Sequence, residues 1–282
     1  MKKVTGVGVI SSDKIGETVG DLCVKANINV RPDVLAALKT AYRVETNPRA
    51  KRILQAIIDN AGIARKEKMA ICQDTGLPFV LMEIGQDVHI TGDLIRAVNK
   101  GVEQGYRRGY FRESIVRDPL RRGVSGYSPA VVHTEITRGA RVKITVLPKG
   151  FGSENKSRLR MFNPTAGIDE IRKFVVEVVK AAGPDACPPY VVGVGIGGTA
   201  DYACFLAKKA LLKSIGRPVS LIPRLEQDLL RDINNLNIGP MGLGGKTTCL
   251  GVNIETFPTH IAGLPVAVNI SCHALRSARG VI

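Results

Sequence analysis

The sequence predicts a mixed α/β protein whose helices pack around mixed β-sheets. Segments with helical spacing of apolar residues alternate with short segments rich in Val and Ile, which is the pattern of such folds. Hydrophobic residues make up 44% of the 282 residues and charged residues 23%, a balance typical of globular proteins. We therefore expect a single large body over residues 1–282, and a boundary near residue 150 remains the alternative.

The first half of the chain begins with about 30 weakly patterned residues. Apolar spacing then predicts helices at 32–42, 48–62 and 93–110, and strands at 79–84, 131–136 and 141–147. Pro32 and Pro48 suit the first turn of a helix, and Gly62 is placed to end one. A turn at Arg138-Gly139 joins the last two strands.

The second half continues the alternation of helices and strands. The patterns predict helices at 169–182, 199–213 and 226–237, and strands at 190–195, 252–254 and 265–270. No internal repeat, low-complexity segment or obvious flexible linker interrupts the pattern. These features favour the single body.

The chain is strongly basic, with 40 Lys and Arg against 25 Asp and Glu, or a net charge of +15. Such a charge can attract nucleic acid, small polyanions or an acidic partner chain. The basic residues are spread along the chain and aromatic residues make up only 5%, so we do not expect nucleic-acid binding. The first residues show no export signal and no apolar run approaches the roughly 18 residues of a membrane span. We therefore expect a cytoplasmic protein that is not attached to a membrane.

The six cysteines form no C-x-x-C pair, and without an export signal disulfides are not expected. The ordinary interpretation of each is a small buried hydrophobe. Cys23 and Cys204 keep that interpretation, because Cys204 is expected on the apolar face of its helix. The remaining cysteines are Cys72, Cys187, Cys249 and Cys272.

Two segments could bind a charged ligand. Cys72-Gln73-Asp74 puts a thiol, an amide and a carboxylate on successive positions of a turn. By spacing alone, an Asx turn made by Asp74 beside a buried cysteine is the simpler interpretation. The segment 149–156 follows a strand, and its glycines let backbone N–H groups point at a carboxylate or phosphate. Its alternative is a flexible exposed loop.

Two further segments resemble nucleotide-binding motifs. Gly193, Gly195 and Gly198 satisfy G-x-G-x-x-G between a strand and a helix, but no acidic residue occurs between Asp201 and Glu226. The segment 239–248 resembles a P-loop, but Pro240 stands where its first glycine is required, so we reject an NTPase. These patterns leave a dinucleotide-binding oxidoreductase subunit as one alternative function for the chain. A basic nucleic-acid-binding protein is another alternative.

Several short motifs occur in a fixed order along the chain, at 72–76, 111–116, 149–156, 187–189, 244–248, 258–262 and 271–273. Together they resemble the class I fumarate hydratases, and the likeness covers about residues 30 to 282. It is to the α subunit of the two-chain form and to the similar α subunit of L(+)-tartrate dehydratase.

The resemblance implies a [4Fe–4S] cluster held by Cys72, Cys187 and Cys272, with Cys249 as the rival third ligand. It implies reversible hydration of fumarate to (S)-malate, with the open iron as Lewis acid, or alternatively dehydration of L(+)-tartrate.

The resemblance also implies roles for other residues. Gln73, Arg112, Gly152, Asn155 and Lys156 are expected to bind the C4 dicarboxylate. Asp74 and His260 are the expected groups for proton transfer, whereas the role of His273 is left open. His89 and His133 are expected to be buried, hydrogen-bonded histidines.

The resemblance implies a partner as well. By this resemblance, a β subunit is expected to supply further substrate ligands and the hydroxyl base, in a heteromer such as α2β2. The chain alone is therefore expected to be inactive.

Overall fold

The computed structural model describes residues 8–121, 123–216 and 222–282. The chain divides into two compact units. Unit 1 comprises residues 1–31, 63–149 and 276–282, and unit 2 comprises residues 32–62 and 150–275. The chain passes from unit 1 to unit 2 between Lys149 and Gly150. This is the position near residue 150 at which the sequence suggested a domain boundary as the alternative. The mixed α/β class is confirmed, whereas the single-domain organisation stays a prediction.

Unit 1 contains a four-stranded sheet in the order β12-β7-β2-β6. Its strands are β2 (Leu77–Gly85), β6 (Val131–Thr137), β7 (Val142–Lys149) and β12 (Ala278–Val281). β2 pairs parallel with β6 and antiparallel with β7, and β7 pairs antiparallel with β12. The strands that the Arg138-Gly139 turn joins are therefore not neighbours, because β2 lies between them.

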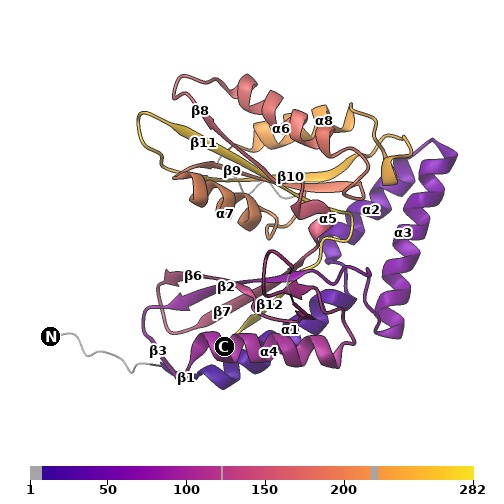
Figure 1. The fold of residues 1–282 in the computed structure, drawn as a ribbon. Coiled ribbons are helices and arrows are strands. Elements are labelled where there is room, and N and C mark those ends of the chain that lie inside the picture. Colours follow the sequence, from indigo (N-terminus) through magenta and orange to yellow (C-terminus); the bar gives the residue numbers. More distant parts are fainter. Residues whose placement is uncertain (1–7, 122, 217–221) are drawn as a thin grey trace. The chain divides into compact units, whose positions relative to one another are not determined.

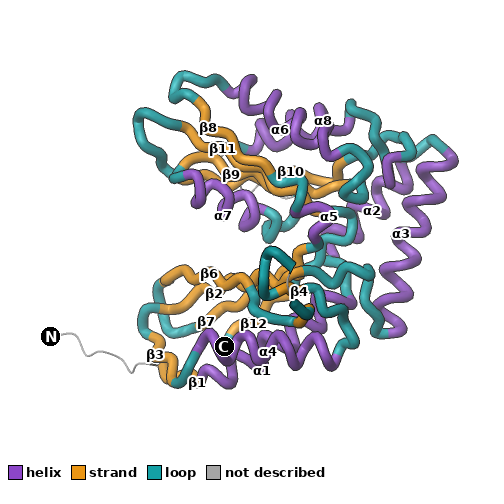
Figure 2. Tube along the Cα trace, in the orientation of Figure 1, coloured by secondary structure: helices purple, strands orange, loops and turns teal. Residues whose placement is uncertain are grey.

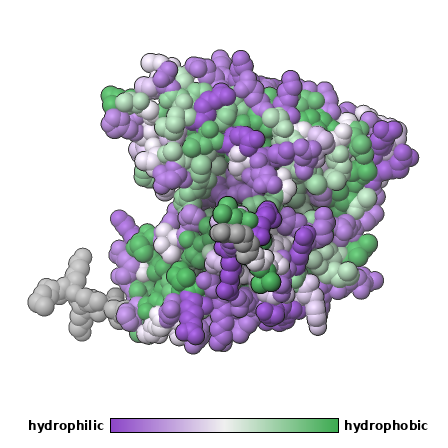
Figure 3. Space-filling view, viewed as in Figure 1, coloured by the Kyte–Doolittle hydropathy of each residue, from purple (hydrophilic) through white to green (hydrophobic). Residues whose placement is uncertain are grey.

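Helices α1 (Ser12–Ile28) and α4 (Leu94–Arg108) cover one face of this sheet (Figure 1). The helices and the sheet share one apolar core, which includes Ile15, Val19, Val80, Met82, Val98, Val102, Ile144 and Val146. Asp93 caps α4, because its Oδ1 accepts from the Arg96 N–H at 3.0 Å. Hydrophilic side chains follow the outward side of α4 along the lower edge of Figure 3.

Short strands complete unit 1. β1 (Gly8–Ser11) pairs parallel with β3 (Val88–Thr91). β4 (Ile115–Val116) pairs antiparallel with β5 (Ser125–Gly126), within a segment that is otherwise mostly loop (Figure 2).

Helices α1 and α4 contact each other backbone to backbone. A Cβ atom added at Gly101 would lie 2.0 Å from the carbonyl oxygen of Gly16, and one at Gly20 would lie 2.8 Å from that of Gly101. Only glycine permits this approach. The sequence did not predict α1, because Gly16 and Gly20 lower helical propensity where the helices meet.

Replacing Gly101 with alanine is expected to destabilise the protein by about 1–3 kcal/mol, because the added methyl group must push the two backbones apart. Gly62 is the matched control. It is exposed in α3 (Pro48–Glu67), which continues past it, and an added Cβ there meets nothing within 4 Å. Gly62→Ala should stabilise by up to about 1 kcal/mol. Urea denaturation of both variants measures the difference, and changes of the same sign would contradict this account.

Unit 2 contains a second four-stranded sheet in the order β10-β9-β11-β8. Its strands are β8 (Arg158–Phe162), β9 (Tyr190–Gly197), β10 (Cys249–Phe257) and β11 (Leu264–Ser271). β9 and β10 run parallel, and β11 is antiparallel to both β9 and β8.

Helices cover both faces of this sheet (Figure 1). α6 (Ile168–Ala182) and α8 (Pro223–Asn234) lie on one face over an apolar core, and α7 (Ala200–Ala210) lies on the other. Added Cβ atoms at Gly193 and Gly195 would lie 2.1 Å from carbonyl oxygens of α7. Close packing of α7 on β9 therefore accounts for these two glycines of the G-x-G-x-x-G pattern.

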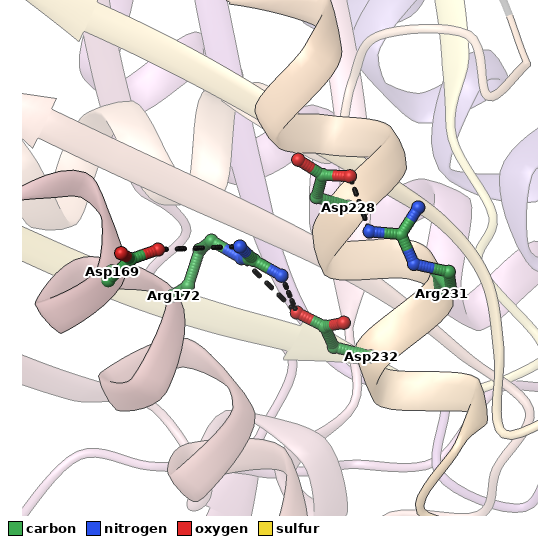
Figure 4. Close-up of polar contacts among 5 residues, drawn as sticks. All are labelled: Asp169, Arg172, Asp228, Arg231 and Asp232. Carbon is green, nitrogen blue, oxygen red and sulfur yellow. Dashed lines mark hydrogen bonds and ion pairs between the residues drawn. The ribbon is translucent and has the colours of Figure 1, made fainter.

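An ion pair ties α6 to α8 (Figure 4). Arg172 Nη2 lies 2.7 Å from Asp232 Oδ2, and both side chains are about three-quarters buried. Arg172 also lies 3.4 Å from Asp169 within α6, and Arg231 lies 2.6 Å from Asp228 within α8. The Asp169 side chain is 94% exposed, so only the pair between the helices is expected to add appreciably to stability.

Glu45 joins helices α2 (Pro32–Val44) and α3 to the glycine-rich segment that resembles a P-loop. Its buried carboxylate accepts from the backbone N–H groups of Thr46, Asn47 and Lys246 at 2.8–2.9 Å. The Glu45 carboxylate therefore accepts the hydrogen bond of the Lys246 backbone N–H, a group that would bind phosphate in a P-loop.

None of the helices in the described parts of the chain combines the length and the apolar character that a membrane span requires.

Candidate functional site

The Cys72–Gly76 turn lies in unit 1, just before β2. Asp74 Oδ1 accepts from the Gly76 N–H at 2.9 Å, so the Asx turn expected from the sequence is present. The Cys72 thiol is half-buried and donates to Gln73 Oε1 at 3.4 Å. Gly76 has φ +75°, and an added Cβ would lie 2.8 Å from the backbone nitrogen of Lys149. The turn therefore depends on glycine at this position.

Two buried side chains that the sequence did not single out hold this turn. The Tyr106 hydroxyl donates to the carbonyl oxygens of Thr75 and Gly76 at 2.8 and 3.1 Å. Burial raises the pKa of Tyr106 well above its ordinary value, so the hydroxyl keeps its proton as a donor. Arg276 is 3% exposed and donates to the Asp74 carbonyl.

Arg112 lies next to the same turn. Its backbone N–H donates to Thr75 Oγ1 at 3.1 Å, and that hydroxyl lies 3.4 Å from the Arg112 carbonyl oxygen. The Arg112 side chain is exposed. Unit 1 thus brings three predicted residues, Gln73, Asp74 and Arg112, to one place, where an exposed guanidinium can bind a carboxylate through two hydrogen bonds.

Unit 2 brings Cys187 and Cys272 together. Cys187 precedes β9 and Cys272 follows β11, and these neighbouring strands pair Val191 with Ser271. The His273 backbone N–H donates to the Cys187 carbonyl oxygen at 3.2 Å, and His273 Nδ1 lies 3.0 Å from the same atom. Burial raises the pKa of Tyr190 above its ordinary value, and the neighbouring Cys187 and Cys272 groups add to the rise. His273 therefore ties the two cysteine segments together.

The six cysteines differ in how deeply they are buried, and none of them forms a disulfide. Cys72, Cys187 and Cys272 are half-buried. Cys23 and Cys249 are fully buried, and burial raises the pKa of each thiol to about 12. Cys204 is exposed, so its expected place on the apolar face was wrong. The buried face of α7 is formed by Ala203, Leu206, Ala207 and Ala210.

Within the described parts of the chain, no three His, Cys, Asp or Glu side chains converge in a metal-binding arrangement.

Alkylation should follow this division. At about pH 8, near the ordinary pKa of a thiol, iodoacetamide is expected to modify Cys72, Cys187 and Cys272 but to spare Cys23 and Cys249. The reagent attacks the thiolate, which burial disfavours at the last two positions. Mass spectrometry of the native apoprotein measures this, and the urea-unfolded chain, in which all six should react, is the control. Early modification of Cys249 would contradict it.

The segment 150–157 contains three predicted ligands in unit 2. It begins with the short helix α5 (Phe151–Glu154) rather than a flexible loop. Gly152 and Asn155 are exposed. Lys156 Nζ lies 2.7 Å from Asp185 Oδ2, and Asp185 precedes Cys187 by two residues. This ion pair links the predicted anion-binding segment to a cysteine segment, and no spacing in the sequence indicated it.

The histidines differ in environment. His260 is exposed in the loop between β10 and β11, and its Nδ1 accepts from the Ala262 N–H at 3.2 Å. That bond engages Nδ1 and leaves Nε2 as the ring nitrogen without a partner in this hydrogen bond. The hydrogen bonds given for His260 in the described residues come from Ala262 and Gly263, and neither of these is a predicted ligand. His89 is exposed on β3, so its expected burial was wrong, and His133 is half-buried with its ring 5.1 Å from that of Phe79.

Comparison with known proteins gives a consistent result. The model of the fumarate hydratase (Fumerase) family matches residues 16–281. A Methanocaldococcus jannaschii protein, provisionally named L(+)-tartrate dehydratase subunit alpha, is 41% identical over 274 residues, which cover 94% of this chain and 96% of that protein. The L(+)-tartrate dehydratase subunit alpha of Escherichia coli strain UTI89 is 30% identical over 270 residues, 94% of this chain and 89% of that protein.

Proposed function

Because the chain belongs to the fumarate hydratase (Fumerase) family, we propose that it is the α subunit of a two-chain hydro-lyase acting on a four-carbon dicarboxylate. The observation that carries the proposal is the family match over residues 16–281. The proposed reaction is the reversible hydration of fumarate to (S)-malate. The names of the relatives favour the dehydration of L(+)-tartrate as the second candidate.

A [4Fe–4S] cluster is the proposed cofactor, with Cys72, Cys187 and Cys272 as its ligands. The donor set fits, because these thiols are half-buried and two of them lie on adjoining segments of unit 2. Cys249 fits poorly, because burial raises the pKa of its thiol to about 12 and the thiol donates to the Gly251 carbonyl. When bound, such a cluster supplies a Lewis-acidic iron with an open position for the substrate hydroxyl group.

The chain's own residues are proposed to bind and orient the dianion. Arg112 provides a bidentate cation, and the exposed Gln73 and Asn155 provide amide donors. The backbone of Gly152 and the ammonium group of Lys156 complete the set, with Lys156 held by Asp185 until a carboxylate competes for it.

Asp74 and His260 are the proposed proton-transfer groups. Asp74 Oδ1 is fixed by the Gly76 N–H. Nδ1 of His260 accepts from the Ala262 N–H, which leaves Nε2 as the ring nitrogen proposed to take part in proton transfer.

A β subunit is the proposed partner, because both relatives are named as α subunits. The experiment that tests the function is an anaerobic assay of the co-expressed α and β chains with fumarate, (S)-malate and L(+)-tartrate. Turnover of fumarate and malate supports the first candidate, and turnover of tartrate alone supports the second. Turnover of none of the three would contradict the proposal.

A further inference from the structure

Two side chains from separate elements of unit 2, Lys208 on α7 and Asn269 on β11, converge on the segment 150–157. Glu154, the last residue of α5, lies with Oε1 2.5 Å from Lys208 Nζ on α7. Its other oxygen, Oε2, accepts from Asn269 Nδ2 on β11 at 3.0 Å. The same Nδ2 donates to Ser157 Oγ at 2.9 Å. One amide therefore holds two residues of the segment at once.

The orientation of the Asn269 amide is determined by its partners. Asn269 is 4% exposed, and among the described residues its Oδ1 has no hydrogen-bond partner. Turning the amide over would place that oxygen against the Glu154 carboxylate, which only accepts. This orientation leaves the buried oxygen without a partner among the described residues, while the amide N–H groups reach the segment 150–157. A buried acceptor without a partner is destabilising, so a compensating role is expected.

The bonded residues surround those predicted to bind the substrate. Glu154 lies between Gly152 and Asn155, and Ser157 directly follows Lys156. Glu154 and Ser157 are half-buried, whereas Gly152 and Asn155 are exposed. The network therefore restrains the backbone on both sides of Asn155 and Lys156 and leaves the exposed groups available to a ligand.

We propose that Asn269 and Glu154 are positioning residues that hold the segment 150–157 in the conformation that binds a substrate carboxylate. This inference rests on the proposed hydro-lyase function. Neither residue touches the substrate. Their effect passes through the backbone of Gly152, Asn155 and Lys156, because a binding segment held in place does not have to be ordered by the ligand.

Asn253 offers a matched control. It lies on β10, is also 4% exposed, and its Nδ2 also donates two hydrogen bonds, to the carbonyl oxygens of Ala210 and Lys213 at 3.2 Å. Asn253 and Asn269 pair with opposite sides of the same residue, Gly193. The two asparagines therefore share strand position, burial and number of donated bonds, but only Asn269 holds the segment 150–157.

The experiment compares Asn269→Ala, Glu154→Gln and Asn253→Ala in the cluster-loaded α–β pair. Asn269→Ala and Glu154→Gln are expected to raise KM for the dicarboxylate about tenfold, with kcat changed little, because binding is weakened equally in the ground and transition states. Amide hydrogen exchange in residues 150–157 should also accelerate in both. Asn253→Ala should lower thermal stability to a similar extent while leaving KM and this exchange unchanged.

The outcomes separate the two proposals. If the wild-type pair turns over neither fumarate, malate nor tartrate, the proposed function fails and this inference fails with it. If the wild-type pair is active but Asn269→Ala and Asn253→Ala raise KM equally, only the positioning role is overturned. Faster exchange in Asn269→Ala with an unchanged KM overturns it as well, since the segment would then be held in place for another reason.

Discussion

Serine in place of Cys72, Cys187 or Cys272 is expected to remove most of the iron from anaerobically reconstituted protein, which should otherwise carry about four iron atoms per chain. Serine offers no thiolate, and each of the three half-buried cysteines is proposed to ligate one corner of the cluster. Iron and sulfide analysis, together with the absorbance near 400 nm that such clusters show, measures the loss.

Cys249→Ser is the matched control for this prediction. Its thiol is fully buried with a pKa raised to about 12, so it does not provide a thiolate near neutral pH, and its removal should leave the iron content unchanged. A cluster that survives in Cys272→Ser but disappears in Cys249→Ser would reverse the assignment of the third ligand.

The isolated chain is expected to show negligible hydratase activity even when its cluster is intact, and addition of the β subunit should restore turnover. A dianion bound by Arg112 and Lys156 alone is exposed to water, whose high dielectric constant weakens ion pairs and polarisation. A second protein surface excludes that water and adds ligands. The comparison requires one assay of cluster-loaded protein with and without β.

The charge of the chain adds a condition to this experiment. At a net charge of +15, association with an acidic docking face on β should slow as salt is added. Full turnover by the isolated chain would place the catalytic base within this chain and end the two-chain proposal.

Local pattern was enough to predict the strongly amphipathic helices. Helices α4 and α6 begin and end within about two residues of the expected positions, because a polar face and an apolar face alternate regularly along them. The sequence did not predict helix α1, because part of its buried surface is glycine, which adds nothing to the pattern of apolar side chains. The sequence also did not predict the order of the strands, since a turn at Arg138-Gly139 does not reveal that β2 separates β6 from β7.

In the candidate site too, local features could be predicted from the sequence, whereas long-range contacts could not. Asp74 and its turn follow from neighbouring residues, and so does the expectation that Cys72 stands beside them. The bond from Asn269 to Glu154 joins residues that are 115 positions apart, and Lys156 and Asp185 are 29 apart. Such pairs depend on how strands and helices meet, which a pattern of local spacing does not contain.

The sheet of unit 1 has a consequence for the protein's synthesis. β7 ends at Lys149, but its antiparallel neighbour β12 begins only at Ala278, roughly 130 residues later. At the usual 5–20 residues per second, a ribosome needs roughly 6 to 26 s to deliver that strand. During this interval residues 150–275, the larger part of unit 2, emerge while one edge of β7 lacks its partner. The nascent chain is therefore most open to mispairing and to chaperone capture at β7, until translation reaches residue 281.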